Sequence, residues 1–588
     1  MAMKTGHHDV GGGHAHEHHE MGYWRRYIFS TDHKVIGVQY AVTALCFLFF
    51  GFCLVMIMRW QLAYPGEELP LIGRLFSEAS MPGGVMLPEF YNSLGAMHGT
   101  IMVFLGVVPL LVGGFGNYVM PLQIGAPDMS FPKINMMSYW VYAAGGVVML
   151  ASFFVKGGAA NSGWTSYAPL SVIATPGQTM WLLGMVLLIT SSLLGSLNFI
   201  TTIIQLRAKG MTMFRLPFFV WAQFVTAFLL LLAFPPLEAA GVLQLMDRVA
   251  GTSFFMPEGL VVSGQPAPHT GGGSPLLWQH LFWFLAHPEV YVLILPGMGI
   301  VAEVVANNTR KPLWGYRLAV YSLMFLGFMS FIVWAHHMFM TGMGTALSAF
   351  FALTTMIISI PSVIILTVFL LSLHGASMRF NVPMLFALAF MPMFAIGGLT
   401  GLPLGLPAAD IPLHDTYYVI AHFHYVVVPG SIFAIFAGIY HWYPKVTGRK
   451  LNEVLGKLHF WLSFLFANAV FMPMFFIGLA GVSRRLYDQT VYAHGDAVQG
   501  LTRMSSWAAW MFGLSQLPFI INFFMSLRAG EKVTDNPWEA TTLEWATPTP
   551  PPHGNFLTEP VVFRGPYEYS APGASRDFWP QHHATAEA

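Results

Sequence analysis

The sequence predicts an all-α membrane protein, built as a bundle of about twelve transmembrane helices. Two observations support this fold class. Only 9% of the 588 residues are charged, 55% are hydrophobic, and the mean hydropathy is +0.58, whereas a soluble protein of this size needs a far more charged surface. In addition, apolar runs of spanning length recur along the chain. The formal net charge of zero gives no indication of a nucleic-acid partner.

The apolar runs define one membrane domain, residues 30–530, between two tails, residues 1–29 and 531–588. In lipid each run must form a helix, because a helix satisfies all of its own backbone hydrogen bonds. We expect these helices near residues 35–59, 94–119, 136–155, 177–206, 217–235, 277–306, 316–339, 347–374, 382–403, 417–441, 458–481 and 505–527.

The tails and loops predict the orientation of the chain. Lys and Arg residues concentrate in the loops that share a side with both tails, so the positive-inside rule places both termini in the cytoplasm, at the cytoplasmic membrane. The second tail is Pro-rich around Pro548–Pro552, which indicates a disordered or partner-bound segment. The first tail could bind a divalent metal, although we interpret it as passive; its histidines are His7, His8, His14, His16, His18 and His19.

Six histidines lie inside the expected helices, where a polar side chain is costly and usually functional. They are His98, His287, His336, His337, His422 and His424. With the orientation above and a rise of about 1.5 Å per residue, all six fall in the outer half of the bundle. One such histidine is more often a hydrogen-bonded core residue. Six at one depth indicate metal binding, because neutral imidazole is a ligand for both copper and haem iron.

The spacing of these histidines predicts how metals divide among them. The adjacent pair His336 and His337, with one histidine from a neighbouring helix, gives a three-nitrogen site that suits copper. The side chains of His422 and His424 point about 200° apart around one helix, so they cannot serve one metal, but each can bind an iron. His98 can then complete a six-coordinate, low-spin haem and leave the other haem open to a gas.

Three motifs carry a family resemblance: HPEVY at His287–Tyr291, WAHHMF around the histidine pair, and HDTYYVIAHFHYV at His414–Val426. Together they resemble subunit 1 of cytochrome c oxidase, in the haem–copper oxidase superfamily, from Ser30 to about residue 530. The resemblance implies one copper ion on His287, His336 and His337. It implies a high-spin haem on His422 and a low-spin haem on His98 and His424, both expected to be type a. It also implies a cross-link between His287 and Tyr291, which their i, i+4 spacing permits.

The resemblance also implies a path for protons from the cytoplasm. Glu289 lies two residues from His287 near the middle of the bilayer, where apolar surroundings favour its protonated form. Asp128 lies in the cytoplasmic loop after helix 94–119, at the position where the family's path starts. Small polar residues in helices are commonly contacts between helices, but four of them match the path's water-holding positions: Asn117, Asn135, Ser191 and Ser192.

On the outer side, Arg484 and Arg485 stand together against the positive-inside rule. Paired arginines there fit fixed anions such as haem propionates. Trp164 and Asp410 match the family's propionate-contact region, and His414 with Asp415 resembles its outer magnesium site, which is usually shared with another subunit.

One departure concerns the lysine that proton-pumping members usually carry in the eighth helix. The segment Pro361–Ile365 replaces P-T-G-x-K and puts Ile365 at the lysine position, and Gly342–Ala349 lacks the acidic residues common in relatives. An isoleucine cannot carry a proton, so that second path is missing or rebuilt. These losses favour, as an alternative, a nitric oxide reductase on the same scaffold, because two NO molecules need only two electrons and two protons.

We predict the catalytic subunit of a respiratory terminal oxidase that reduces O2 to water and moves protons outward. Tyr291 would supply a proton and an electron, and Glu289 would pass on protons from Asp128. This chain has no pair of copper thiolates, so subunit 2 would accept electrons from cytochrome c or quinol, alongside further oxidase subunits. A transporter or channel without redox chemistry is the alternative from another class, because intramembrane charges suit one too.

Overall fold

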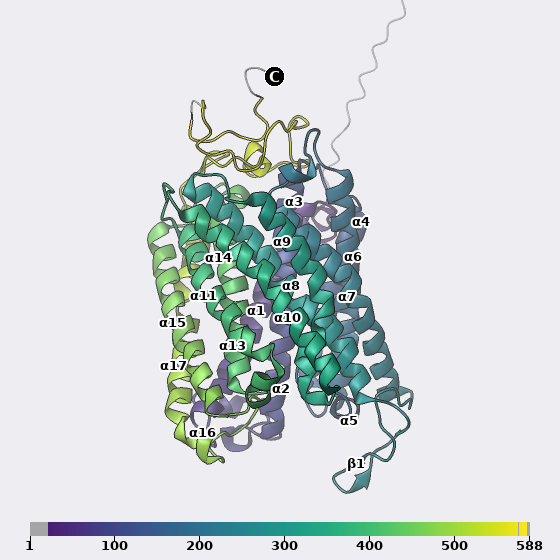
Figure 1. Cartoon of the computed structure of the whole chain (residues 1–588). Helices are drawn as coiled ribbons and strands as arrows, with labels where there is room; N and C mark the ends of the chain where they lie inside the picture. Colours follow the sequence, from purple (N-terminus) through teal and green to yellow (C-terminus); the bar gives the residue numbers. More distant parts are fainter. Residues whose placement is uncertain (1–21, 574–575, 585–588) are drawn as a thin grey trace, which may run out of the picture.

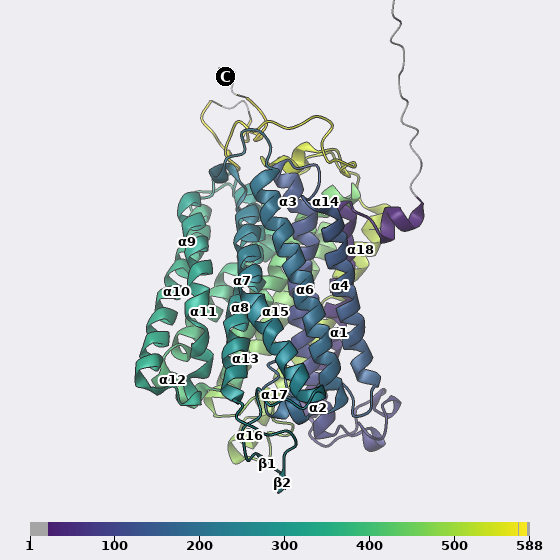
Figure 2. The ribbon, with the colours of Figure 1, turned by 90° about the vertical axis from the view of Figure 1, so that its right-hand side faces the viewer.

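The computed structural model describes residues 22–573 and 576–584. Within them, twelve helical spans are long and apolar enough to cross a membrane. The helices stand side by side as one bundle (Figures 1 and 2). This arrangement confirms the predicted fold class. Cys46 and Cys53 are both free, and the tail histidines His7–His19 lie outside the described residues.

Most spans are uninterrupted α-helices or nearly so. Seven of them are α1 (His33–Ala63), α6 (Pro176–Gln205), α7 (Phe218–Val249), α8 (Pro275–Thr309), α10 (Gly344–Leu373), α11 (Val382–Leu404) and α15 (Glu453–Leu479). Two more are α4 (Pro132–Ala151) with its 3₁₀ extension η6 (Ser152–Phe154), and α17 (Gln499–Leu514) followed by α18 (Leu517–Ala529).

The other three spans change their winding partway. They are α2 (Pro88–Thr100) with η4 (Ile101–Val107), η5 (Pro109–Gly116) and α3 (Asn117–Ile124); α9 (Tyr316–Met329) with η8 (Ser330–Ile332) and η9 (Trp334–Thr341); and α13 (Tyr417–Val427) with η10 (Val428–Phe433) and α14 (Ala434–Thr447).

The remaining elements are short and lie outside the spans. They are η1 (Trp24–Ile28), η2 (Gly73–Leu75), η3 (Pro82–Gly84), α5 (Leu170–Ile173), η7 (Met213–Arg215), α12 (Pro407–Leu413), α16 (Ala493–Ala497) and η11 (Leu543–Ala546). Strands β1 (Val261–Val262) and β2 (Gln265–Pro266) form an antiparallel hairpin, in which Val261 pairs with Pro266. The hairpin projects from the end of the bundle opposite the C-terminal segment (Figure 1).

The changes of winding occur beside site histidines. His98 lies in the last turn of α2, just before the wide π turns of η4 and η5, and His424 lies just before the π turns of η10. Pro109 and Pro429 lack the N–H that an α-helix needs, and a wide turn accommodates this loss. The tighter 3₁₀ winding of η9 carries both His336 and His337.

The C-terminal segment differs from the prediction. We call residues 531–573 and 576–584 the C-terminal cap, because they cover one end of the bundle near α3 and α14 (Figure 1, yellow). The cap buries large side chains, among them Leu543, Trp545, Tyr567 and Tyr569. The expectation of a disordered tail is therefore wrong for these residues. Aromatic side chains offset the ordering entropy by packing on the helix ends, and composition alone does not reveal such a contact.

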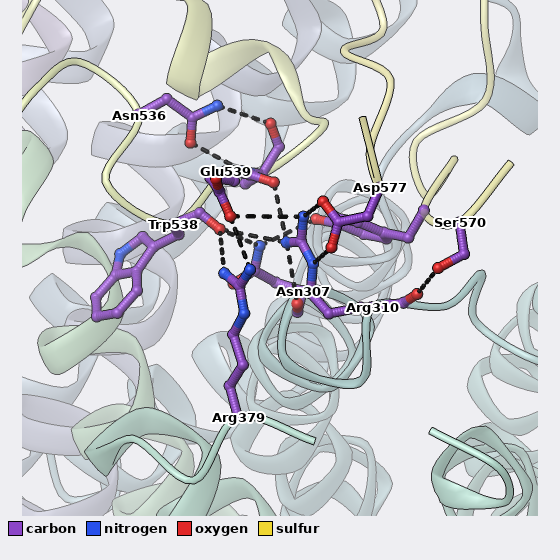
Figure 3. A network of polar contacts seen from close by, with 10 residues as sticks. Asn307, Arg310, Arg379, Asn536, Trp538, Glu539, Ser570 and Asp577 are labelled. Atoms are coloured by element: carbon purple, nitrogen blue, oxygen red, sulfur yellow. Dashed lines mark hydrogen bonds and ion pairs between the residues drawn. The ribbon is translucent and has the colours of Figure 1, made fainter. Parts of the chain in front are cut away.

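Arg310, at the end of α8, holds the C-terminal cap in place (Figure 3). Its Nε and Nη2 donate to the two oxygens of Asp577 at 2.8 and 2.7 Å, and its Nη1 donates to the carbonyl of Glu539 at 3.0 Å. The guanidinium carbon also lies 4.7 Å from the ring centre of Tyr569. One turn earlier, Asn307 donates to the carbonyl of Trp538 at 3.1 Å. A buried cation thus joins two separate stretches of the cap to one helix end.

Candidate metal centre

Three histidine side chains meet between α8 and η9. One nitrogen from each of His287, His336 and His337 lies within 4.8 Å of the others, and no second group of this kind occurs in the part of the chain that the structure describes. Nε2 of His337 lies 3.3 Å from Nδ1 of His287 and 3.1 Å from Nε2 of His336. Nitrogens this close, from three neutral rings, fit a single copper ion between them.

Neighbouring side chains fix the orientation of these rings. Nδ1 of His336 lies 2.9 Å from the hydroxyl of Thr355 on α10, and His337 stacks on Trp283 with ring centres 3.8 Å apart. Nδ1 of His287 faces the other histidines, which leaves its Nε2 buried without a hydrogen-bond partner. The ring of Tyr291 lies 4.9 Å from the His287 ring on the same helix. An unpartnered nitrogen beside that ring fits the implied cross-link.

The other three histidines share one hydrogen-bonding pattern. Nδ1 of His98, His422 and His424 lies 2.8 Å from the backbone carbonyl of Gly51, Gly397 and Ile420, respectively. A carbonyl oxygen can only accept, so Nδ1 carries the proton in each ring and Nε2 keeps a free electron pair. Haem and metal ligands are commonly held in this way by a backbone carbonyl behind the ring. These donors therefore fit axial ligands of iron.

All six histidines line one cavity of about 1760 Å³. Within it, His422 lies close enough to His336 to interact electrostatically, and His424 does the same with His98. The two histidines of α13 thus face different partners, as their spacing predicts. Gly401 makes room for His422, because a Cβ there would lie 2.7 Å from the ring. The cavity thus presents histidine nitrogens from α2, η9, α8 and both histidines of α13.

The outer wall of the cavity carries cations. Arg484 donates from Nε to Asp415 at 2.5 Å, whereas Arg485 has no side-chain hydrogen bond to the described residues. Burial and the neighbouring Arg484 lower the pKa of Arg485, and together they outweigh the opposing charge of Asp415. Trp164 and Asp410 line the same cavity. This wall fits a ligand that brings its own carboxylates, as haem propionates do.

The predicted outer magnesium ligands His414 and Asp415 lie near each other. Nε2 of His414 lies 3.8 Å from Asp415, and its Nδ1 lies 3.2 Å from Asp410. The hydrogen bond to Asp410 raises the pKa of His414. Burial acts to raise the pKa of Asp415, but the charges of Arg484 and His414 outweigh it and lower this pKa. A hard cation here would need further oxygen ligands from outside these two residues.

The chain resembles known proteins over nearly its whole length. Residues 35–515 match the family described as cytochrome c and quinol oxidase polypeptide I. The chain is 45% identical to the alternative cytochrome c oxidase subunit 1 of Bradyrhizobium diazoefficiens, over 96% of this chain and 94% of that protein. The chain belongs to the subunit 1 family of cytochrome c and quinol oxidases. This membership confirms the resemblance seen in the three histidine motifs.

Other members of the family lie at similar distances. The cytochrome c oxidase subunit 1 of Synechocystis is 44% identical over 93% of each chain, and that of Cereibacter sphaeroides is 40% identical over 92% of this chain and 96% of that one. The cryo-EM structure of a haem–copper terminal oxidase dimer has a TM-score of 0.69 at 21% identity, over 85% of each chain, and so shares the fold.

As a subunit 1 family member, the chain is the catalytic subunit of a respiratory haem–copper oxidase. Membership implies haem and copper as cofactors, a multi-pass position in the membrane, and assembly with other oxidase subunits. It excludes the transporter or channel without redox chemistry that intramembrane charges alone left open.

On the side of the C-terminal cap, the structure brings part of the expected proton path together. Asn117, Ser191 and Ser192 line a small cavity of about 40 Å³, whereas Asn135 lies outside it, buried with both polar atoms unpartnered. Sequence reasoning missed two further residues on this wall. The Tyr40 hydroxyl donates to Ser138 at 3.0 Å. A lone tyrosine or serine in an apolar helix gives no signal, because such residues are usual helix contacts.

Two carboxyl groups lie at either end of this region. Asp128 accepts from the backbone N–H of Met129 at 2.7 Å, and burial raises the pKa of Asp128 to about 6. Glu289 is 1% exposed, lines the large cavity near His287, and has no hydrogen-bond partner on either carboxyl oxygen. An ionised carboxylate in such surroundings is costly, so its protonated form is favoured. Both groups therefore suit proton transfer.

Two further residues, Ile365 and Arg59, are buried inside the bundle. Ile365, at the family's lysine position, is fully buried, so no proton carrier stands there. Arg59 of α1 is buried near His98 and His424, where its shorter hydrogen bond, to Ser505, is 3.4 Å long.

Proposed function

We propose that the six histidines hold one copper and two haems in the arrangement the family implies, for reduction of O2 to water. Copper binds to His287, His336 and His337, the high-spin haem to His422, and the low-spin haem to His98 and His424. When bound, these groups carry electrons to O2. The observation that supports this most is the shared pattern of three Nδ1–carbonyl bonds, which leave three Nε2 atoms free in one cavity with the three-histidine cluster.

We favour type a haems, which carry a long hydrocarbon tail. Apolar side chains line much of the large cavity, among them Phe49 and Phe52 of α1, Phe519 of α18, Leu366 of α10 and Leu399 of α11. Arg59 makes only two long hydrogen bonds, to Ser505 and to the sulfur of Met474, and so offers a donor to a polar substituent on the rim of the low-spin haem.

Residues of this chain supply and guide the protons. Asp128 takes up protons at the cytoplasmic side, and the cavity of Asn117, Ser191 and Ser192 holds water along the way, with Asn135 nearby. Glu289 receives each proton and passes it toward the copper histidines. Tyr291, cross-linked to His287, gives a proton and an electron when the O–O bond of O2 breaks. A buried carboxyl and a phenol in one cavity are suited to general acid chemistry.

Residues on the outer side of the bundle bind the haem propionates and contact other subunits. Arg484, Arg485, Trp164 and Asp410 contact haem propionates, and His414 with Asp415 contributes to a magnesium site completed by another subunit. Both termini lie in the cytoplasm, because the loops on the side of the C-terminal cap carry most of the Lys and Arg. Subunit 2 accepts electrons from cytochrome c or a quinol, since both cysteines here are isolated on α1.

A second candidate is nitric oxide reduction, favoured by the isoleucine at the lysine position. One experiment separates the two functions: consumption of O2 and of NO by the purified complex, measured side by side with its visible spectrum and copper content. We expect haem bands, copper, and O2 consumption. His98→Ala should remove the low-spin band, whereas the control His374→Ala, on an exposed loop, should not. NO turnover with negligible O2 uptake would overturn the oxidase.

A further inference from the structure

A third buried carboxyl group lies at the cytoplasmic end of the bundle, beneath the C-terminal cap. Glu303 of α8 accepts from the hydroxyl of Tyr567 at 2.6 Å and from the backbone N–H of Phe219 at 3.2 Å. The same hydroxyl accepts from the backbone N–H of Phe218 at 2.7 Å. Both backbone groups open α7, so one role of Glu303 is to cap that helix. Capping uses one oxygen and leaves the other for a proton.

The helix that Glu303 caps carries polar side chains inward from it. Gln223 and Thr226 follow Phe219 at intervals of four and three residues, so all three share one face of α7. Both side chains are fully buried, and the Oε1 of Gln223 and the hydroxyl of Thr226 have no hydrogen-bond partner. The amide nitrogen of Gln223 donates to the carbonyl of Leu111 at 3.0 Å, which turns the side chain toward η5. Buried polar atoms left without partners usually hold water.

This polar face reaches the small cavity of the proposed proton path. A Cβ on Gly116 would lie 3.2 Å from Oε1 of Gln223 and 2.6 Å from the ring of Phe199. Phe199 lines the small cavity, as do Asn117, next to Gly116, and Leu230, one turn beyond Thr226 on α7. Gly116 therefore lies against both the Gln223 amide and the Phe199 wall of the cavity, and the absence of a side chain there lets these two groups approach each other.

We propose that Glu303, Gln223 and Thr226 form a second branch for proton uptake, which joins the small cavity without passing through Asp128. The inference rests on the proposed function of that cavity as part of the proton path. Glu303 releases its proton to water held by Gln223 and Thr226, and a proton from the cytoplasm replaces it. The branch would supply protons that the family's missing lysine cannot.

The C-terminal cap also brings a second carboxyl group near Glu303. Glu544 of η11 accepts from Gln123 at 3.0 Å on one oxygen, and its other oxygen is buried without a partner. It lies close enough to Glu303 for their charges to interact. Burial raises the pKa of Glu544. Like charges repel each other, so ionisation of one of these carboxyl groups favours the protonated form of the other.

The test uses the intact oxidase complex and an Asp128→Asn background, which closes the first branch. O2 consumption and proton uptake, read with a pH-indicator dye, are compared for Gln223→Leu, Thr226→Val and Glu303→Gln. The last change keeps an acceptor for the α7 cap but removes the proton. The matched controls are Gln205→Leu and Thr201→Val on α6. Gln205 is exposed, and the hydroxyl of Thr201 donates to the carbonyl of Leu197 in the same helix.

We expect each test variant to lower the residual turnover and proton uptake of Asp128→Asn by about tenfold or more. Haem spectra should stay unchanged, the controls should have no effect, and Thr226→Ser should restore the rate. Equal rates with and without Gln223→Leu, or no residual turnover in Asp128→Asn alone, would overturn the branch. Unchanged turnover in Asp128→Asn would instead refute Asp128 as an uptake site. In that case Glu303→Gln, Gln223→Leu and Thr226→Val, each made in the otherwise unmodified complex, must lower its turnover about tenfold, or the branch is refuted as well. Absence of O2 consumption in the unmodified complex would refute the oxidase assignment itself.

Discussion

Replacing Arg310 by methionine is expected to weaken the attachment of the C-terminal cap by about 3 kcal/mol. Methionine keeps the aliphatic stem but removes two hydrogen bonds to Asp577, one to the Glu539 carbonyl, and the contact with the Tyr569 ring. Asp577 is 47% exposed and can be hydrated after the loss, so its pair with Arg310 counts for about 1 kcal/mol. The bond from a charged donor to the partly buried carbonyl of Glu539 and the cation–π contact add about 1–2 kcal/mol each.

A change of about 3 kcal/mol increases local opening of the cap by roughly a hundredfold, since each 1.4 kcal/mol is a factor of ten. Hydrogen exchange measures this opening at amides bonded within the cap, such as Ser570 to Asp577 and Trp579 to Glu568. Arg379→Met is the matched control. Its guanidinium is 41% exposed and pairs with Glu539, which is 51% exposed, so its loss should change opening by less than about 1 kcal/mol.

The result that refutes this reasoning is equal exchange in the two variants. It would mean that aromatic packing alone holds the cap and that the buried guanidinium contributes nothing beyond its desolvation cost. Arg310→Lys should fall between them, because an ammonium keeps the charge but cannot bond both oxygens of Asp577 in a fork.

Three further outcomes follow from the site. His337→Ala should remove copper, read by elemental analysis, while the low-spin haem band persists, because His98 and His424 lie elsewhere in the cavity. Glu289→Gln should lower turnover by about a hundredfold or more with both haem bands intact, because an amide cannot release the proton. Burial raises the pKa of Asp128 to about 6. Ionisation of this carboxyl group therefore destabilises the folded protein above about pH 6, whereas below the pKa of the unfolded chain the group is protonated in both states and has no such effect. Asp128→Asn should therefore raise the free energy of unfolding at about pH 8 by up to about 2 kcal/mol, which a higher thermal midpoint reports, and leave both unchanged at about pH 3, while turnover falls; a gain at low pH instead would contradict the burial argument.

Hydropathy along the chain predicted the twelve spans correctly, because lipid forces each apolar run to satisfy its own backbone within one helix. Their bounds were less certain. The second helix was expected near 94–119, and the structure extends it from Pro88 to Ile124, since helices continue past the apolar core into the polar boundary. The division of His422 and His424 between two partners also followed from helical periodicity alone.

The copper site combined local and tertiary information. The pair His336–His337 is adjacent in sequence, but the third ligand, His287, lies 50 residues away. The resemblance of the HPEVY motif predicts His287 as this ligand. The sequence alone gives no signal for several polar residues of this wall, because one hydroxyl or amide in an apolar run has no period and no motif. They are Tyr40, Ser138, Gln223 and Thr226. They gain meaning only where several helices bring them to one wall.

The sequence by itself determined the membrane class, the number of spans and the depth of the histidines, since each depends on residues close together along one helix. Only the tertiary structure decided that the Pro-rich C-terminus is ordered, that Arg59 and Arg310 are buried cations, and that Glu303 lies near Glu544. These features depend on contacts between segments hundreds of residues apart. Their energies come from burial and charge pairing that no local pattern encodes.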